Sequence, residues 1–117
     1  MAKHDTSKKI VSYDSENDIL LVHKGFAADE KFKGNLDIGG VVLDMSTKKR
    51  VRGIEVLNAT NFFQGLVAAD VLLHLTDADF RAVMEPQRIA LTVTFYIQQE
   101  AIPARIAVPL ATPDTTY

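Results

Sequence analysis

The feature that most constrains the fold of this chain is a long alternation of residue types near its end. In the stretch RIALTVTFYIQ, every second residue from Ile89 to Ile97 is large and apolar, and those between are mostly small or polar. Successive side chains of a strand point to opposite faces of a sheet. The period of two therefore predicts an antiparallel strand with one buried face and one solvated face.

The alternation continues over residues 102–110, after a turn near Glu100. Pro103 and Pro109 lie in this second run, and proline cannot donate a backbone hydrogen bond to a neighbouring strand. We therefore expect the last strand to lie at an edge of its sheet, or at least to place its two prolines outside the hydrogen-bonded ladder.

Two hairpins are predicted in the first half of the chain. The runs KKIVSYD and DILLVHK are rich in branched and aromatic residues and flank a polar turn at 15–17, where Asp14 can accept hydrogen bonds from backbone amides. The polar, glycine-bounded segment 25–35 then predicts a surface loop.

The second hairpin has its turn at 46–49, which would place Val41 opposite Ile54 and Leu43 opposite Arg52. Alternation then assigns one set of side chains to each face. The first face carries Val41, Leu43, Ile54 and Val56, and the second carries Val42, Asp44, Val51, Glu55 and Leu57.

Two helices are predicted between the hairpins and the last two strands. Asn58 is the expected N-cap of the first helix, and Thr76 with Asp79 resembles a capping box at the start of the second, which Pro86 ends. Their apolar stripes, at three-to-four spacing, are Phe62, Phe63, Leu66 and Val67 in the first and Phe80, Val83 and Met84 in the second.

These elements predict an α+β fold with the order ββββααββ. About six antiparallel strands would form one sheet, and both helices would pack on one of its faces. We expect a single domain over residues 1–117, with flexible ends at 1–7 and 112–117.

Composition excludes several classes of function. The chain has 117 residues and a formal net charge of −2, which gives no general attraction to nucleic acid or to an anionic membrane. It contains no cysteine, so disulfides and thiolate chemistry are excluded. The first ten residues lack the apolar run of a signal peptide, and no stretch is long and apolar enough for a membrane span, so we expect a soluble cytoplasmic protein.

A family resemblance is carried by the stretches YDSENDILLV and DIGGVVLDMSTKKRVRGIEVLNAT. Their pattern is Tyr-Asp, an Asp before an apolar strand, a Gly-led apolar strand ending in Asp, and a Gly-Ile-Glu strand before a helix. The positions are Tyr13, Asp14, Asp18, Leu20, Gly40, Val41, Val42, Leu43, Asp44, Gly53, Ile54 and Glu55. Over about residues 10–63 the chain resembles a group of small prokaryotic proteins of unknown function, DUF2283. The resemblance implies a shared fold and no particular reaction.

Asp44 and Glu55 are carboxylates within apolar strands, and they allow two interpretations. They could form an acid–base pair whose pKa values are set by burial and by each other's charge. Alternatively, Asp44 caps the turn at Ser46 and Thr47, and Glu55 meets a cation across the sheet. No histidine or serine stands at motif spacing, so the structural interpretation is favoured and no catalytic residue is assigned.

Metal and cofactor sites are not predicted either. Asp14, Glu16 and Asp18 have the spacing that opens a calcium-binding loop, but the glycine and the twelfth-position carboxylate of that loop are missing. His23 and His74 have no second ligand at metal-binding spacing. Strings typical of hydrolases, zinc proteases and nucleotide-binding loops are absent as well.

The function predicted from these observations is that of a non-catalytic protein-interaction or binding module that self-associates. Helices on one face would leave Val42, Val51 and Leu57 on an uncovered face, which favours a homodimer, with an unidentified protein partner as a further expectation. One alternative is a small-ligand binder or minor enzyme that uses Asp44, Glu55 and the loop 25–35. A weaker alternative is nucleic-acid binding through the basic turn KKRVR at 48–52.

Overall fold

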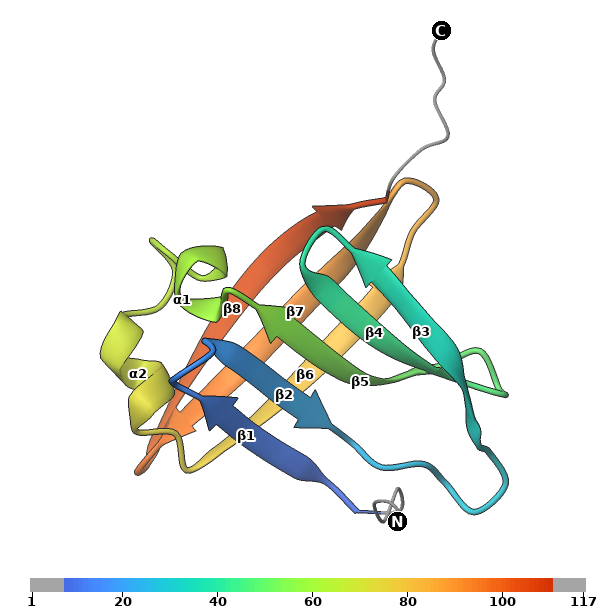
Figure 1. Ribbon diagram of the computed structural model, residues 1–117, viewed down its shortest axis with the longest axis horizontal. Coiled ribbons are helices and arrows are strands. Elements are labelled where there is room, and N and C mark those ends of the chain that lie inside the picture. Colours follow the sequence, from blue (N-terminus) through green and yellow to red (C-terminus); the bar gives the residue numbers. More distant parts are fainter. Residues whose placement is uncertain (1–7, 111–117) are drawn as a thin grey trace, which may run out of the picture.

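The computed structural model describes residues 8–110, which form eight strands and two short helices (Figure 1). The predicted flexible ends lie outside these residues. Strands take up 56% of the described residues and helices 9%. The elements are β1 (Ile10–Asp14), β2 (Ile19–His23), β3 (Phe32–Ile38), β4 (Val41–Ser46), β5 (Val51–Leu57), α1 (Ala59–Phe62), α2 (Ala69–Leu73), β6 (Asp77–Met84), β7 (Arg88–Ile97) and β8 (Glu100–Pro109).

The strands form two antiparallel sheets that lie face to face. The five-stranded sheet has the order β1-β2-β5-β4-β3, and the three-stranded sheet has the order β6-β7-β8. In Figure 1 the long strands of the three-stranded sheet run across those of the five-stranded sheet. Side chains from both inner faces meet in one apolar core. Its fully buried large members include Leu20, Leu43, Ile54 and Val56 from one sheet and Ile89, Leu91, Val93 and Phe95 from the other.

The alternation in β7 is confirmed. Ile89, Leu91, Val93 and Phe95 are each no more than 2% exposed, and the residues between them face outward from the sandwich. The position of β8 is also confirmed, because β8 pairs with β7 and forms one edge of its sheet.

The predicted α+β fold with two helices on one face is wrong. Residues 77–84 form strand β6 rather than the second helix, and they pair with β7 over their whole length. The apolar residues of this segment fit both periods: the predicted stripe has helical spacing, while Ala78, Phe80 and Ala82 alternate. Strand β7 decides between the two periods. When residues 77–84 pair with it as a strand, the backbone hydrogen-bonding groups on that side of β7 find partners and Phe80 is buried in the core.

Strand β3 lies partly within the predicted surface loop 25–35. It pairs with β4 along its length and forms an edge of the five-stranded sheet, which raises the number of strands to eight. Only Ile38 in β3 is buried. A strand with one buried residue needs no regular alternation of apolar side chains, and for this reason the sequence pattern did not indicate it.

The first predicted helix is broken into two short ones at one end of the sandwich, where they connect the two sheets (Figure 1). Gly65 lies between them with φ +83, a conformation that ends a helix. Asn58 does not cap α1, since its side chain makes no capping bond. Instead Asp18 accepts from the Thr60 amide at 3.1 Å and from the Thr60 hydroxyl at 2.6 Å. No helix within residues 8–110 is long and apolar enough to cross a membrane.

The second hairpin has a different register from the predicted one but nearly the same faces. Leu43 lies opposite Ile54 rather than Arg52. A shift of two residues keeps each side chain on its side of the sheet, and the predicted apolar face is accordingly buried. Val51 is the exception, because a bulge near Asp44 pairs it with Met45 and turns it toward the core.

The apolar layer between the sheets predicts a large cost for truncating its central side chains. Phe95 is fully buried and its ring meets that of Phe63 edge to face, with centroids 5.0 Å apart. We expect Phe95→Ala to lower the free energy of unfolding by about 3–5 kcal/mol. Thr94→Ala, on the opposite face of the same strand, should change it by about 0.5 kcal/mol or less. Urea denaturation of both variants tests this, and equal losses would contradict it.

Candidate functional site

Asp44 lies on the outer face of the five-stranded sheet, where it contacts His23 and Asn35. The Asn35 side-chain amide donates to the Asp44 carboxylate, and His23 Nε2 lies 3.5 Å from Asp44 Oδ2. His23 Nδ1 accepts from the Gly25 amide at 2.8 Å, so the neutral ring carries its proton on Nε2, toward Asp44. The predicted cap is wrong, because the Ser46 and Thr47 amides donate to the carbonyl oxygens of Arg50 and Lys31, at 2.9 and 2.8 Å, rather than to Asp44.

Gly53 makes room for this histidine. A Cβ at position 53 would lie 2.3 Å from His23 Cδ2, so any other residue would displace the ring. The glycine of the Gly-Ile-Glu pattern thus has a steric role.

Asp44 and Glu55 do not form the acid–base pair considered above. They stand on neighbouring strands but in successive rows: Asp44 lies opposite Gly53, whereas Glu55 lies opposite Val42. The Asp44 carboxylate is turned toward His23 and Asn35, and no hydrogen bond among the described residues joins the two acids.

A buried carboxylate that the sequence did not indicate lies in the segment 25–35. Glu30 is 4% exposed and accepts from Ser46 Oγ at 2.6 Å and from the Ala27 amide at 3.1 Å. Its Oε1 is also 2.9 Å from Arg50 Nη2 and 3.3 Å from Arg52 Nε. Because the Ser46 hydroxyl, the Ala27 amide and the Arg50 guanidinium stabilise the charged form, the pKa of Glu30 is lowered to about 2.

The basic turn 48–52 is largely engaged by these acids. Arg50 and Arg52 face Glu30, and Lys48 pairs with Asp29. Three of the four cations that the nucleic-acid alternative required are thus in ion pairs, with Arg50 and Arg52 sharing the single charge of Glu30.

The remaining candidates lie apart from one another. Asp14 accepts from the amides of Glu16 and Asn17, as predicted for a turn, while Asp18 accepts from the Tyr13 hydroxyl at 2.6 Å. Burial and the nearby Asp18 raise the pKa of Tyr13 to about 12. His74 is exposed, and its Nδ1 lies 2.9 Å from the Asp70 carbonyl oxygen.

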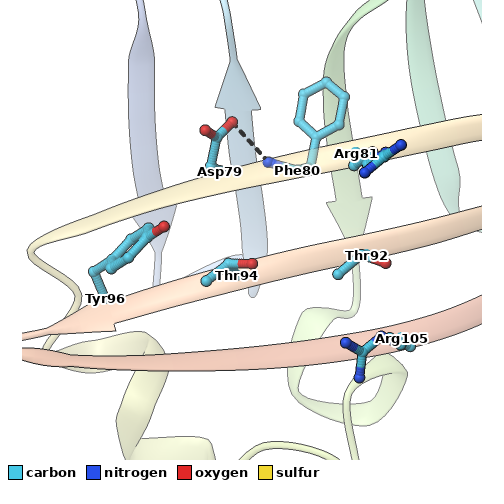
Figure 2. Close-up of a pocket in the computed structure, with 7 residues that line it drawn as sticks. All are labelled: Asp79, Phe80, Arg81, Thr92, Thr94, Tyr96 and Arg105. Carbon is cyan, nitrogen blue, oxygen red and sulfur yellow. Dashed lines mark hydrogen bonds between the residues drawn. The ribbon is translucent and has the colours of Figure 1, made fainter.

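A hollow with converging polar groups lies on the outer face of the three-stranded sheet (Figure 2). It has a volume of about 330 Å³. Its lining residues are Asp79, Phe80, Arg81, Thr92, Thr94, Tyr96 and Arg105.

Three of these residues form a straight line across the sheet, which we call the arginine row: Arg81 on β6, Thr92 on β7 and Arg105 on β8. Thr92 pairs directly with Arg81 on one side and with Arg105 on the other, and Figure 2 shows the three in line. Neighbouring strands lie about 4.8 Å apart, so the two arginine Cα atoms are roughly 10 Å apart.

The charges of the arginine row are not neutralised by the rest of the described chain. Arg50, Arg52 and Arg88 each pair with a glutamate. Arg81 and Arg105, in contrast, have no carboxylate within ion-pair distance among residues 8–110, and both are exposed. Two guanidinium groups on either side of a hydroxyl form a donor set suited to a carboxylate or a phosphate.

The arginine row was missed because its members are distant in sequence. The predicted last strand placed Arg105 on the outward face of its sheet, and this was the one indication in the sequence that an arginine lies there. Arg81 stood in a predicted helix, so no pairing could bring the two together.

The ionisation of Glu30 gives a prediction about acid stability. Its pKa is about 2 in the folded chain, against an ordinary value of 4.5. This difference stabilises the fold above pH 4.5, and the contribution is lost as the pH falls from 4.5 toward 2. We expect Glu30→Gln to have a lower free energy of unfolding than the unmodified chain at pH 7. Between pH 4.5 and pH 2, the free energy of unfolding should decrease less in this variant than in the unmodified chain. Urea titrations at several pH values test this, with Glu100→Gln, an exposed residue at the start of β8, as the control. A pH profile of Glu30→Gln parallel to that of the unmodified chain would contradict it.

The comparisons with known proteins agree with the resemblance found in the sequence. "Protein of unknown function (DUF2283)" matches residues 10–59. An uncharacterized protein of Methanocaldococcus jannaschii is 33% identical over 87 residues, which are 74% of this chain and 72% of the relative. A Methanosarcina mazei protein named "Putative hypoxanthine phosphoribosyltransferase" is 25% identical over 87 residues, 74% of this chain and 67% of the relative. No solved structure gives a significant match. The chain belongs to the DUF2283 family of proteins of unknown function.

Proposed function

We propose that this chain is a non-catalytic binding module, and that the outer face of its three-stranded sheet binds the anionic group of a ligand. The observation that carries this proposal is the arginine row, in which two unpaired guanidinium groups flank the Thr92 hydroxyl. A planar guanidinium matches the geometry of a carboxylate or phosphate and binds it through two parallel hydrogen bonds. Because both side chains come from rigid, paired strands, the row is largely formed before the ligand arrives.

The same residues favour binding over catalysis. A hydroxyl becomes a nucleophile when a general base lies beside it, whereas the two neighbours of Thr92 across the strands are cations. No histidine lines the hollow. The enzyme alternative would need Asp44 and Glu55 to act together, and the Asp44 carboxylate instead faces His23 and Asn35.

The name of the Methanosarcina mazei relative refers to the transfer of a phosphoribosyl group. A ligand that carries phosphate is compatible with the arginine row. The arginine row supports the binding of an anionic group and does not by itself support a transfer reaction. The cytoplasmic location expected from the sequence stays a prediction.

Binding of pyrophosphate, measured by isothermal titration calorimetry, tests this function. We expect Arg81→Gln and Arg105→Gln each to weaken binding by about tenfold or more, since a hydrogen-bonded charge contributes about 1.5–3 kcal/mol. The matched control is Lys33→Gln, which removes one exposed cation from the other sheet. Equal affinities for all three variants and the unmodified chain would refute the proposal, and so would a failure of pyrophosphate and of phosphate monoesters alike to bind.

Self-association is a second candidate function, and the outer face of the five-stranded sheet favours it. Four apolar side chains stand near the half-buried Glu55: Ile19, Leu21, Val42 and Leu57. Burying such a face between two copies would remove apolar surface from water. We propose a symmetric dimer through this face, since closed two-fold pairs are the commonest assemblies.

Light scattering at high micromolar concentration tests the dimer. We expect the mass of two chains, and we expect Leu21→Glu to give the mass of one, because Leu21 lies opposite Glu55 and the two carboxylates would be desolvated without a cation in the dimer interface. Leu66→Glu is the control, since Leu66 is 48% exposed in the connection between the two helices. A single-chain mass for the unmodified protein would rule the dimer out.

A further inference from the structure

We infer that the ligand of the three-stranded sheet is a nucleoside monophosphate, with its phosphate at the arginine row and its base on the ring of Tyr96. This inference rests on the proposed function and narrows its ligand. The order of chemical groups along β7 matches the order of phosphate, sugar and base in such a ligand.

The hollow contains three successive rows of side chains, and each differs in chemistry. The arginine row is followed by a row with Asp79 and Thr94, and then by a row with Tyr96 (Figure 2). Successive rows are two residues apart on β7, or about 7 Å, so the three rows span about 13 Å. The sequence of groups is thus two cations, then a carboxylate with a hydroxyl, then an aromatic ring.

The middle row suits a sugar. Asp79 Oδ1 accepts from the Phe80 amide at 2.9 Å, and Figure 2 shows the carboxylate at the β6 edge of the hollow. A carboxylate oxygen in this position can accept hydrogen bonds from a pair of ribose hydroxyls. The Thr94 hydroxyl lies opposite Asp79 and can donate or accept beside it.

Asp79 also limits how much negative charge the ligand can carry. An anion at the arginine row is attracted, but a second phosphate near Asp79 would meet a like charge. Asp77, one row further on, is paired with Lys9 at 3.2 Å. The face is therefore positive at the arginine row and carries a negative group at Asp79. A ligand with a single phosphate at its end fits this gradient, whereas the continuous charge of a nucleic-acid strand does not.

Tyr96 provides a surface for the base. It is 36% exposed on the outer face, and Figure 2 shows its ring leaning along the sheet toward the row of Asp79 and Thr94. Its neighbour on β8 is Ala101, which leaves room beside the ring. Bases stack on aromatic side chains with little dependence on their identity. Inorganic phosphate would contact one end of the hollow and a free base the other, while a nucleotide contacts both.

The test compares adenosine monophosphate with ribose 5-phosphate, which lacks the base, by isothermal titration calorimetry. We expect the nucleotide to bind about tenfold more tightly, the gain typical of one stacked base. Tyr96→Leu should remove this difference and leave ribose 5-phosphate binding unchanged, and Arg105→Gln should weaken both ligands. Phe32→Leu, which alters an exposed aromatic of the other sheet, should change neither. Thermal denaturation of each variant verifies its fold.

Two results would overturn the inference while leaving the proposed function in place. The first is equal binding of both ligands, still dependent on Arg105. The second is an RNA oligonucleotide that binds more tightly than the mononucleotide with a steep dependence on salt. If pyrophosphate, ribose 5-phosphate and the nucleotide all fail to bind, both the inference and the proposed function fail.

Discussion

The apolar layer between the two sheets is the interaction on which the rest of this structure depends. Every strand that contributes to it gives alternate side chains to the core and the remaining ones to the outside. Residues such as Leu43 and Phe95 are therefore fixed by packing against the facing sheet. The outer faces are left with side chains that the core does not need. The arginine row takes one outward residue from each strand of the three-stranded sheet, beside the inward Phe80, Val93 and Ala104.

The part of the chain that matches the family coincides with one layer of the sandwich. Residues 10–59 contain all five strands of the five-stranded sheet. Several of the signature residues have structural roles there: Asp18 joins the first hairpin to α1, and Gly53 accommodates His23. The arginine row lies in the other layer. The family match therefore accounts for the scaffold, and the proposed binding surface lies outside the matched residues.

The elements that the sequence predicted correctly are those whose pattern is local. The two hairpins, the buried face of β7 and the edge position of β8 follow from alternation, turn residues and proline over short stretches. Strands β3 and β6 depend on their neighbours. β3 has one buried residue and is held by β4, and Phe80 in β6 fits a helical or an extended pattern until β7 is beside it. The arginine row combines both difficulties, because it exists only once β6 and β8 pair with β7.

The edges of the three-stranded sheet also bear on what can bind to it. The backbone amide of Glu85 donates to the carbonyl oxygen of Arg88, and therefore points toward β7. Along a strand of an antiparallel pair, successive amides point alternately toward the partner strand and away from it. The amides of Ala78 and Phe80 consequently point away from β7. Those two amides are occupied by the carboxylates of Asp77 and Asp79, at 2.8 and 2.9 Å. The opposite edge, β8, contains two prolines. Strand addition by a peptide is hindered at both edges, so a ligand must reach this sheet through the side chains of its outer face. Asp79 belongs to both features, because its carboxylate occupies the Phe80 amide at the edge and the residue also lines the hollow.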